Sequence, residues 1–170
     1  MYDYLHKEAK RIVNRCGTRD PLKIASDLGI HVIFDNDFAT LKGMYVIIKR
    51  SRFIIINGNL NERDINTVCA HEIGHDRFHR ALAKSGALQE LMLYDMKRRP
   101  EYEANIFASD ILIDDFEILE LIEYDYDMVQ IARELGVDLN LVLIKIDALQ
   151  SQGYGFRVPY RPPADFLGRN

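Results

Sequence analysis

The chain has 170 residues, which fits one domain with a sizeable core, and hydrophobic residues make up 48% of it. Lys and Arg total 22 against 26 for Asp and Glu, and this net charge of −4 argues against strong non-specific nucleic-acid binding. The two cysteines are far apart, and the chain has neither an apolar leader nor a run of membrane-spanning length, so we expect a soluble, cytoplasmic protein without a disulfide framework.

The first thirty residues predict two helices. Residues 3–16 carry apolar side chains at helical spacing, with Asp3 placed to cap the start and Gly17 to end the helix. Asp20 followed by proline is typical of a cap and first turn, and this second helix is expected to stop at Gly29.

Strands follow the two helices. Residues 31–34 are rich in branched and aromatic side chains, and residues 44–48 and 53–56 predict a hairpin joined across residues 49–52. His31 is interpreted as a strand-end residue and not as a ligand. The apolar runs are continuous, which predicts a sheet covered by a helix on one face and shielded on the other. An edge strand of such a sheet can hold a peptide by adding it as a further strand.

A His-Glu-x-x-His pattern at residues 71–75 lies inside the next predicted helix, which Asn61 is placed to cap and which continues to about residue 82. His71 and His75 are one turn apart on one face, so both imidazoles can reach a single metal ion. Glu72 points away from that face, where it can take a proton from a water at the metal's open position without being a ligand. Gly74 is expected to remove bulk beside the metal.

Two further side chains near this pattern have open interpretations. His79 is another turn along the helix, about 6 Å beyond His75, so we favour a structural role or a hydrogen bond to a ligand over direct metal binding. Asp76 is interpreted as a solvated carboxylate or as a partner of a ligand.

Residues 83–99 are expected to form a loop and a short helix over the cleft, with Tyr94 either packed or near a substrate carbonyl.

A later helix, beginning near Pro100, offers a third ligand. Glu101, Ala104, Asn105 and Ala108 share one face, which combines a carboxylate, an amide placed to hydrogen-bond a ligand, and two small residues that allow close helix packing. Glu101 would complete a site of two histidines and one glutamate, with Glu103 as the alternative. Zinc is expected from these ligand types, although manganese or iron also suits them.

These two separated motifs, HEIGH and EYEANIFASDIL, together with the upstream FIIINGNLNERDINTVCA, resemble the ImmA/IrrE family of metallopeptidases over roughly residues 20–150. The resemblance implies zinc held by His71, His75 and Glu101, with Glu72 as the catalytic carboxylate, and a zincin-like core of mixed α+β class that is rich in helices. Family members often have a proline after the third-ligand helix, whereas this chain has Ile113-Asp114-Asp115.

The remaining chain predicts a helix at residues 116–124 and a helix pair at 127–150 that is similar to a helix-turn-helix. Because the second helix of the pair is nearly all apolar, with Lys145 as its only basic residue, we expect it to pack on the core. Residues 1–151 are therefore interpreted as one zincin-like domain, and residues 152–170 as an extended tail.

The leading functional hypothesis is a zinc-dependent endopeptidase. The family resemblance implies a helix-turn-helix transcriptional repressor as its substrate, hence an anti-repressor role in a mobile element or a stress response. The rival hypotheses are a DNA-binding module, or a protein-binding module, with a non-catalytic metal site; the unfilled fourth ligand position and the presence of Glu72 argue against both.

Overall fold

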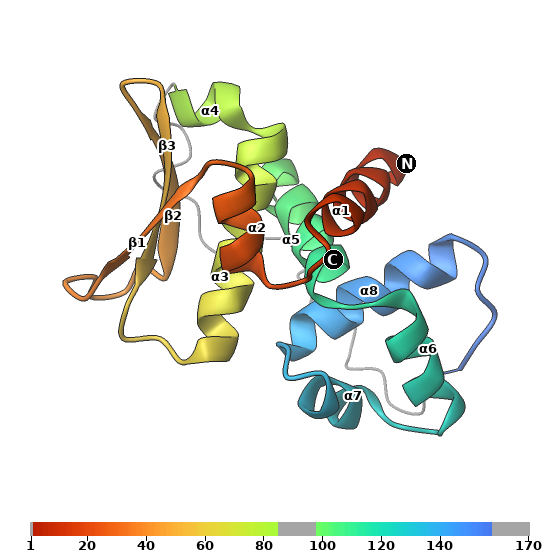
Figure 1. Ribbon diagram of the computed structural model, residues 1–170. Helices are drawn as coiled ribbons and strands as arrows, with labels where there is room; N and C mark the ends of the chain where they lie inside the picture. The colour runs from red at the N-terminus through yellow and green to blue at the C-terminus, as the bar shows by residue number, and fades with distance from the viewer. Residues whose placement is uncertain (1, 85–97, 158–170) are drawn as a thin grey trace.

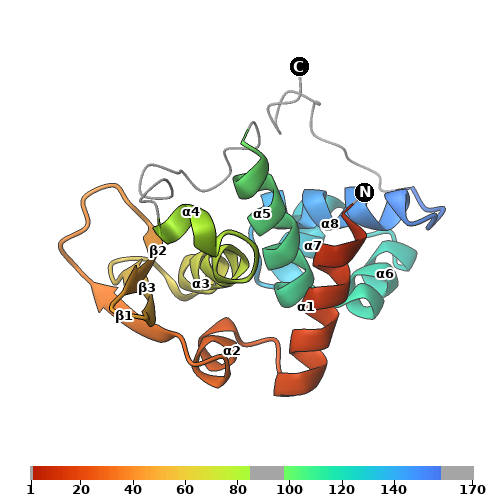
Figure 2. The ribbon, with the colours of Figure 1, turned by 90° about the horizontal axis from the view of Figure 1, so that it is seen from above.

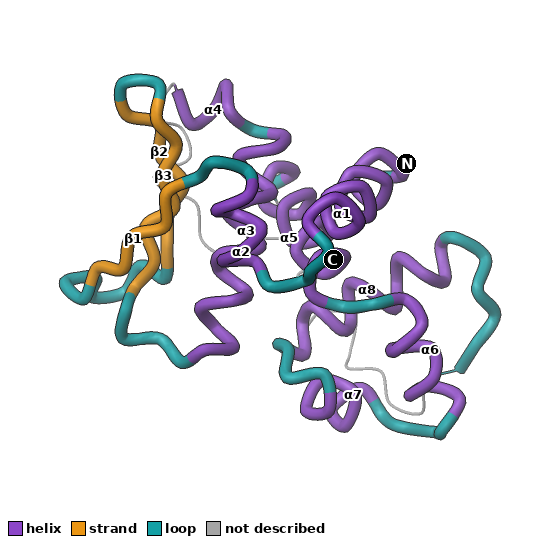
Figure 3. The backbone as a smooth tube through the Cα atoms, viewed as in Figure 1, coloured by secondary structure: helices purple, strands orange, loops and turns teal. Residues whose placement is uncertain are grey.

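A computed structural model describes residues 2–84 and 98–157, and within these ranges it has the expected helix-rich α+β architecture. The strands gather on one side of the molecule and the helices fill the rest (Figures 1 and 3). In chain order the elements are α1 Asp3–Cys16, α2 Pro21–Asp27, β1 His31–Asp35, β2 Gly43–Ile48, β3 Ser51–Asn57, α3 Glu62–Phe78, α4 Arg80–Lys84, α5 Arg99–Leu112, α6 Asp115–Glu123, α7 Met128–Glu134 and α8 Leu139–Ser151.

The two N-terminal helices begin and end largely where the sequence predicts. Gly17 ends α1 in the left-handed conformation at a φ of 65°, and the Asp20 side chain accepts hydrogen bonds from the first-turn amides of α2. The expected cap at Asp3 is wrong: the capping position is Tyr2, without a side-chain hydrogen bond, and Asp3 pairs instead with Lys7 at 2.7 Å within the first turns.

The sheet has the strand order β1-β3-β2, with β1 parallel and β2 antiparallel to β3. The hairpin turn is shorter than predicted, because β3 already begins at Ser51. Its two central residues, Lys49 and Arg50, have φ angles of 47° and 73°, which suits the right-handed twist of a two-residue hairpin but is uncommon outside glycine and asparagine.

One face of this sheet lies against α3, where Tyr45, Ile54 and Ile56 are buried. The opposite face carries Ile33 and Ile48, which are 45% and 54% exposed. The predicted shielding of this second face is therefore not seen in the part of the chain that the structure describes.

Helix α5 lies at the centre of the helical part, with α3 on one side and α1 and α8 on others (Figure 2). The close approach of α3 and α5 depends on Gly74, where a Cβ atom would lie 3.0 Å from the Cα of Ala104. The prediction that small residues of α5 allow close packing is confirmed, but Gly74 makes room for that helix and not for a metal.

The C-terminal helices form the predicted pair and pack onto α5 through α8, whose side chains at residues 141–146 are buried. Lys145 is only 2% exposed and lies between Asp110 and Asp115, at 2.6 and 2.5 Å. The one basic residue of α8 is thus unavailable to a DNA backbone. None of the described helices combines the length and hydropathy of a membrane span.

Candidate metal centre

Three of the predicted site residues meet in the interior, at the contact between α3 and α5. His71 and His75 project from one face of α3, and Glu101 comes from the first turn of α5. One ligand atom from each lies within 4.8 Å of the others, and all three side chains are buried. The two Nε2 atoms are 3.0 Å apart, and each is 3.1 Å from a carboxylate oxygen of Glu101.

The local sequence explains how Glu101 reaches this point. Pro100 lies in the first turn of α5, where its missing N–H has no intrahelical partner to lose. One turn later, Oδ1 of Asn105 accepts a hydrogen bond from Nδ1 of His71 at 2.8 Å, as predicted for the amide of this helix. The close contact at Gly74 and Ala104 brings the two helices near enough for both interactions.

These residues fit a divalent metal ion by the chemistry of their donor atoms. With its Nδ1–H donated to the Asn105 oxygen, a neutral His71 presents the lone pair of Nε2 to the cluster. Oε1 of Glu101 is buried without a hydrogen-bond partner among the described residues. Lone pairs therefore converge on one point with no proton donor that serves them all, and a cation satisfies such a cluster.

In the metal-free site, the surroundings of Glu101 and His75 favour the protonation states that bind a cation. Burial opposes the ionisation of Glu101, but the close contacts with the imidazoles of His71 and His75 outweigh it and lower the pKa of this carboxyl to about 2. Burial also lowers the pKa of His75 to about 4, because the imidazolium form is poorly solvated there. A carboxylate and a neutral imidazole are the forms that coordinate metal. His71 differs, because its burial is outweighed by its contacts with Glu101 and by the charge of Glu72, which raise its pKa, so a metal ion must displace a proton there.

Glu72 lies beside this triad but is not part of it. Burial raises the pKa of its carboxyl to about 7, a shift that the neighbouring His71 and the backbone of Tyr45 on β2 only partly offset. A carboxyl with a pKa near neutrality can both take up and release a proton at ordinary pH. The structure thus places all four predicted site residues together, while their roles as ligands and base stay predictions.

Comparison with known proteins identifies the family to which this fold and site belong. The Peptidase_M78 family, described as the IrrE N-terminal-like domain, matches residues 25–147. The chain belongs to this family. It is 31% identical over 144 residues to the "Uncharacterized immunity region protein 2" of Bacillus phage phi105, a match that covers 85% of this chain and 90% of that protein. The predicted resemblance to ImmA/IrrE metallopeptidases is confirmed.

A solved structure shares the fold at much lower identity. A Mycobacterium tuberculosis transcriptional regulator superposes with a TM-score of 0.62 at 19% identity, over 86% of this chain. The chain spans about half of that regulator, because the match covers 47% of its length. At this identity the likeness shows the fold alone.

Behind the triad, this IrrE-like domain has a further layer of polar side chains that the sequence only partly reveals. Helix α3 ends at Phe78, before the predicted residue 82, and the ring of His79 turns back to bring its Nδ1 within 3.0 Å of Nδ1 of His75. Glu103, the alternative third ligand, lies outside the triad and contacts His79 at 3.1 Å. The only sequence signal for the contact between His79 and His75 was their spacing of four residues.

Asp76 belongs to a separate buried network that the sequence did not predict. It is fully buried, so its interpretation as a solvated carboxylate is wrong. The hydroxyl of Tyr45 donates to it at 2.8 Å, and Arg52 and Arg80 pair with it at 3.0 and 2.8 Å. This network ties β2 and β3 to α3 immediately behind His75. Only Arg80, four residues after Asp76, is related to it by helical spacing, whereas nothing in the residue spacing relates Tyr45 or Arg52 to it.

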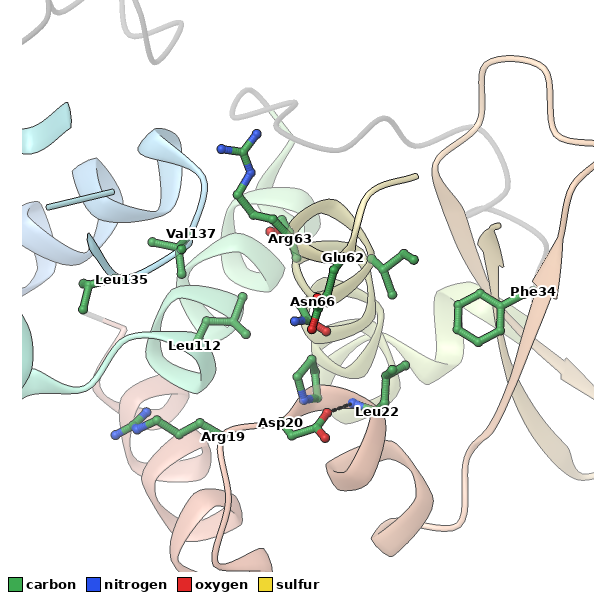
Figure 4. A pocket seen from close by; sticks show the side chains of 14 residues that line it. Arg19, Asp20, Leu22, Phe34, Glu62, Arg63, Asn66, Leu112, Leu135 and Val137 are labelled. Carbon is green, nitrogen blue, oxygen red and sulfur yellow. Dashed lines mark hydrogen bonds between the residues drawn. The ribbon is translucent and has the colours of Figure 1, made fainter. Parts of the chain in front are cut away.

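A hollow of about 550 Å³ opens elsewhere on the IrrE-like domain, between the N-terminal halves of α2 and α3 and the turn from α7 to α8 (Figure 4). Leu22 and Asn66 face it from the two helices, and Val137 faces it from the turn. None of the three triad residues lines this hollow, so the hollow is separate from the candidate metal centre. The segment over the cleft predicted at 83–99, with Tyr94, lies mostly outside the described residues.

Proposed function

We propose that this protein is a zinc-dependent endopeptidase whose metal is held by His71, His75 and Glu101. The observation that carries the proposal is the convergence of these three buried side chains from α3 and α5, with the carboxylate of Glu72 next to them. Three protein ligands leave the fourth position of a tetrahedral metal open for water or substrate, which distinguishes catalytic from structural zinc sites.

The residues of the site have different roles in the proposed reaction. A bound divalent metal polarises the scissile carbonyl and makes water more acidic. Glu72 accepts the proton of the attacking water and then delivers it to the leaving amine, a role that its burial-raised pKa near 7 suits. His71 and His75 stay neutral, and Glu101 stays ionised, so that these three hold the metal and take no proton.

The edge strand β2 is the proposed binding site for the substrate. β2 is an edge strand, and its Tyr45 backbone contacts the Glu72 carboxylate, so this edge runs past the proposed catalytic group. A substrate segment in extended form would add to β2 through backbone hydrogen bonds, which recognise a strand largely without regard to sequence. Such binding requires an unfolded or exposed segment of the substrate protein.

For the substrate itself we propose a helix-turn-helix transcriptional repressor. Support comes from the family and from the name of the phage phi105 relative, which places that protein in a phage immunity region. Cleavage of a repressor would release the genes that it silences, which is an anti-repressor role. The reaction would then take place in the cytoplasm, where the repressor meets DNA.

Co-expression tests this proposal. The protein is produced together with a helix-turn-helix repressor encoded next to its gene, and the repressor is examined for a single cut by mass spectrometry. We expect cleavage by the wild type and none by Glu72→Gln, while both retain one zinc per chain.

The matched control is Glu62→Gln, which changes an exposed carboxylate at the start of the same helix and should cleave like the wild type. Full cleavage by Glu72→Gln would refute the assigned base. Uncut repressor in the presence of zinc-loaded wild type would refute the proposed substrate.

A further inference from the structure

A chain of hydrogen bonds leads from the proposed ligand His75 to the edge of the molecule. Nδ1 of His75 lies 3.0 Å from Nδ1 of His79, and Nε2 of His79 lies 3.1 Å from Oε2 of Glu103. The other oxygen of Glu103 accepts a hydrogen bond from Nε of Arg99 at 2.6 Å. Both residues between His75 and Arg99, namely His79 and Glu103, are buried.

The chemistry of these groups fixes which atom donates and which accepts in each of these hydrogen bonds. Arg99 can only donate, and the carboxylate of Glu103 can only accept, so Nε2 of His79 must carry the hydrogen that it shares with Glu103. A neutral His79 then has a lone pair on Nδ1. Nδ1 of His75 must therefore carry the hydrogen in the contact between the two rings.

The backbone holds His79 in the required place. Its N–H still bonds to the carbonyl of His75 at 2.9 Å, but its φ of −124° ends the helix there. A residue that continued α3 as a regular turn would project its side chain along the helix face. The break at His79 instead lets its ring reach both His75 and α5.

We propose that His79 and Glu103 form a positioning pair that holds His75 in the tautomer with Nε2 free for the metal, and thereby strengthens metal binding. This inference rests on the proposed metal centre. The two histidine ligands are then held differently, because His71 is backed by the neutral amide of Asn105 at 2.8 Å and His75 by a ring linked to a carboxylate. Such partners orient a ligand and raise its basicity.

Three substitutions at His79 separate this role from simple packing. His79→Asn places an oxygen where Nδ1 was, and so keeps an acceptor for His75 while it cuts the link to Glu103. His79→Gln places its amide nitrogen near the position of Nε2, and so keeps the link to Glu103 without the acceptor. His79→Leu removes both groups.

Zinc affinity is measured by competition with a chromophoric chelator. We expect His79→Leu and His79→Gln to bind zinc about 10–100-fold more weakly than the wild type, with His79→Asn clearly tighter than both. Glu103→Gln keeps the shape and an acceptor oxygen but loses the charge, and it should weaken binding by less than His79→Leu. Nitrogen-15 NMR of the zinc-loaded wild type should show the hydrogen of His75 on Nδ1.

Thr67→Val is the matched control, since it alters a buried polar side chain of α3 whose hydroxyl has no hydrogen-bond partner among the described residues. It should bind zinc like the wild type. Thermal unfolding of each metal-free variant shows whether it folds, and Glu103→Gln carries the test if His79→Leu does not.

The proposal is overturned if His79→Gln binds zinc as tightly as His79→Asn, if affinity simply follows the stability of the metal-free variants, or if none of them differs from the wild type. In those cases the metal centre itself stands. Failure of the wild-type protein to bind zinc would overturn both the metal centre and the positioning pair.

Discussion

At the scale of single residues, the candidate site combines two carboxyl groups whose environments shift their pKa values in opposite directions. Burial makes the charged form of Glu72 costly, whereas Glu101 keeps its charge because two imidazoles contact it. The same site thus contains one carboxylate suited to exchange protons and one suited to hold a metal. The His-Glu-x-x-His spacing predicted which side chains meet, because helix geometry alone relates residues one turn apart.

The buried carboxyl of Glu72 predicts an unusual dependence of stability on pH in the metal-free protein. Its folded-state pKa of about 7 exceeds the ordinary value of 4.5, so the folded state binds an extra proton between these values. This group therefore costs the fold stability as pH rises from 4.5 to 7. Glu72→Gln should raise the free energy of unfolding at pH 8 by up to about 3 kcal/mol, as measured by urea denaturation of metal-free protein.

At pH 4 the same substitution should change the stability of the metal-free protein little, because Glu72 is protonated there in both states. The two pH values thus serve as each other's control. An equal change in unfolding free energy at both would show that the carboxyl of Glu72 is not perturbed by burial.

At the scale of elements, the third ligand depends on how closely α3 and α5 approach. A methyl group at Gly74 would lie 3.0 Å from the Ala104 Cα and 3.3 Å from a ring carbon of Phe107. The sequence suggested that Gly74 removes bulk beside the metal, and it could not reveal the true neighbour, because the partner helix lies some thirty residues later in the chain. The hydrogen bonds of Asp76 to Tyr45 and Arg52, and the contact of His79 with Glu103, escaped prediction for the same reason: these partners belong to other elements.

Gly74→Ala should therefore force the two helices apart. Overpacking of this kind typically costs about 1–3 kcal/mol of folding free energy, and the displaced Glu101 should weaken zinc binding as well. Denaturant unfolding and chelator competition measure the two effects.

Gly155→Ala is the control for this prediction, since nothing lies within 4 Å of the added carbon there. It should leave both quantities unchanged. A Gly74→Ala protein with wild-type stability and zinc affinity would contradict the account of the helix contact.

At the scale of the whole molecule, one buried ion pair network connects the beginning and the end of the described chain to α5. Asp110 of α5 contacts His6 of α1 at 2.5 Å and Lys145 of α8 at 2.6 Å. The apolar pattern of α8 predicted that this helix packs inward, but not that its lysine would be buried with it. The division into one domain at residues 1–151 and a tail at 152–170 stays a prediction, and residues 158–170 lie outside the described chain.

Removing the charge of Lys145 should destabilise the fold strongly. Lys145→Met leaves Asp110 buried without the ammonium group of Lys145, and breaking a buried pair in this way costs about 3–5 kcal/mol. Lys7→Met provides the control, because Lys7 and Asp3 are 77% and 71% exposed and such surface pairs contribute about 1 kcal/mol or less. Equal unfolding free energies for the two variants would show that the network does not stabilise the chain.

The account depends above all on a single divalent ion held by two imidazoles and one carboxylate. X-ray absorption at the zinc edge of the loaded protein tests this directly. We predict one zinc per chain with two imidazole nitrogens at about 2.0–2.1 Å and oxygen ligands at about 2.0–2.2 Å. A sulfur ligand at about 2.3 Å, as Cys69 would supply, or a chain that binds no stoichiometric zinc, would contradict it.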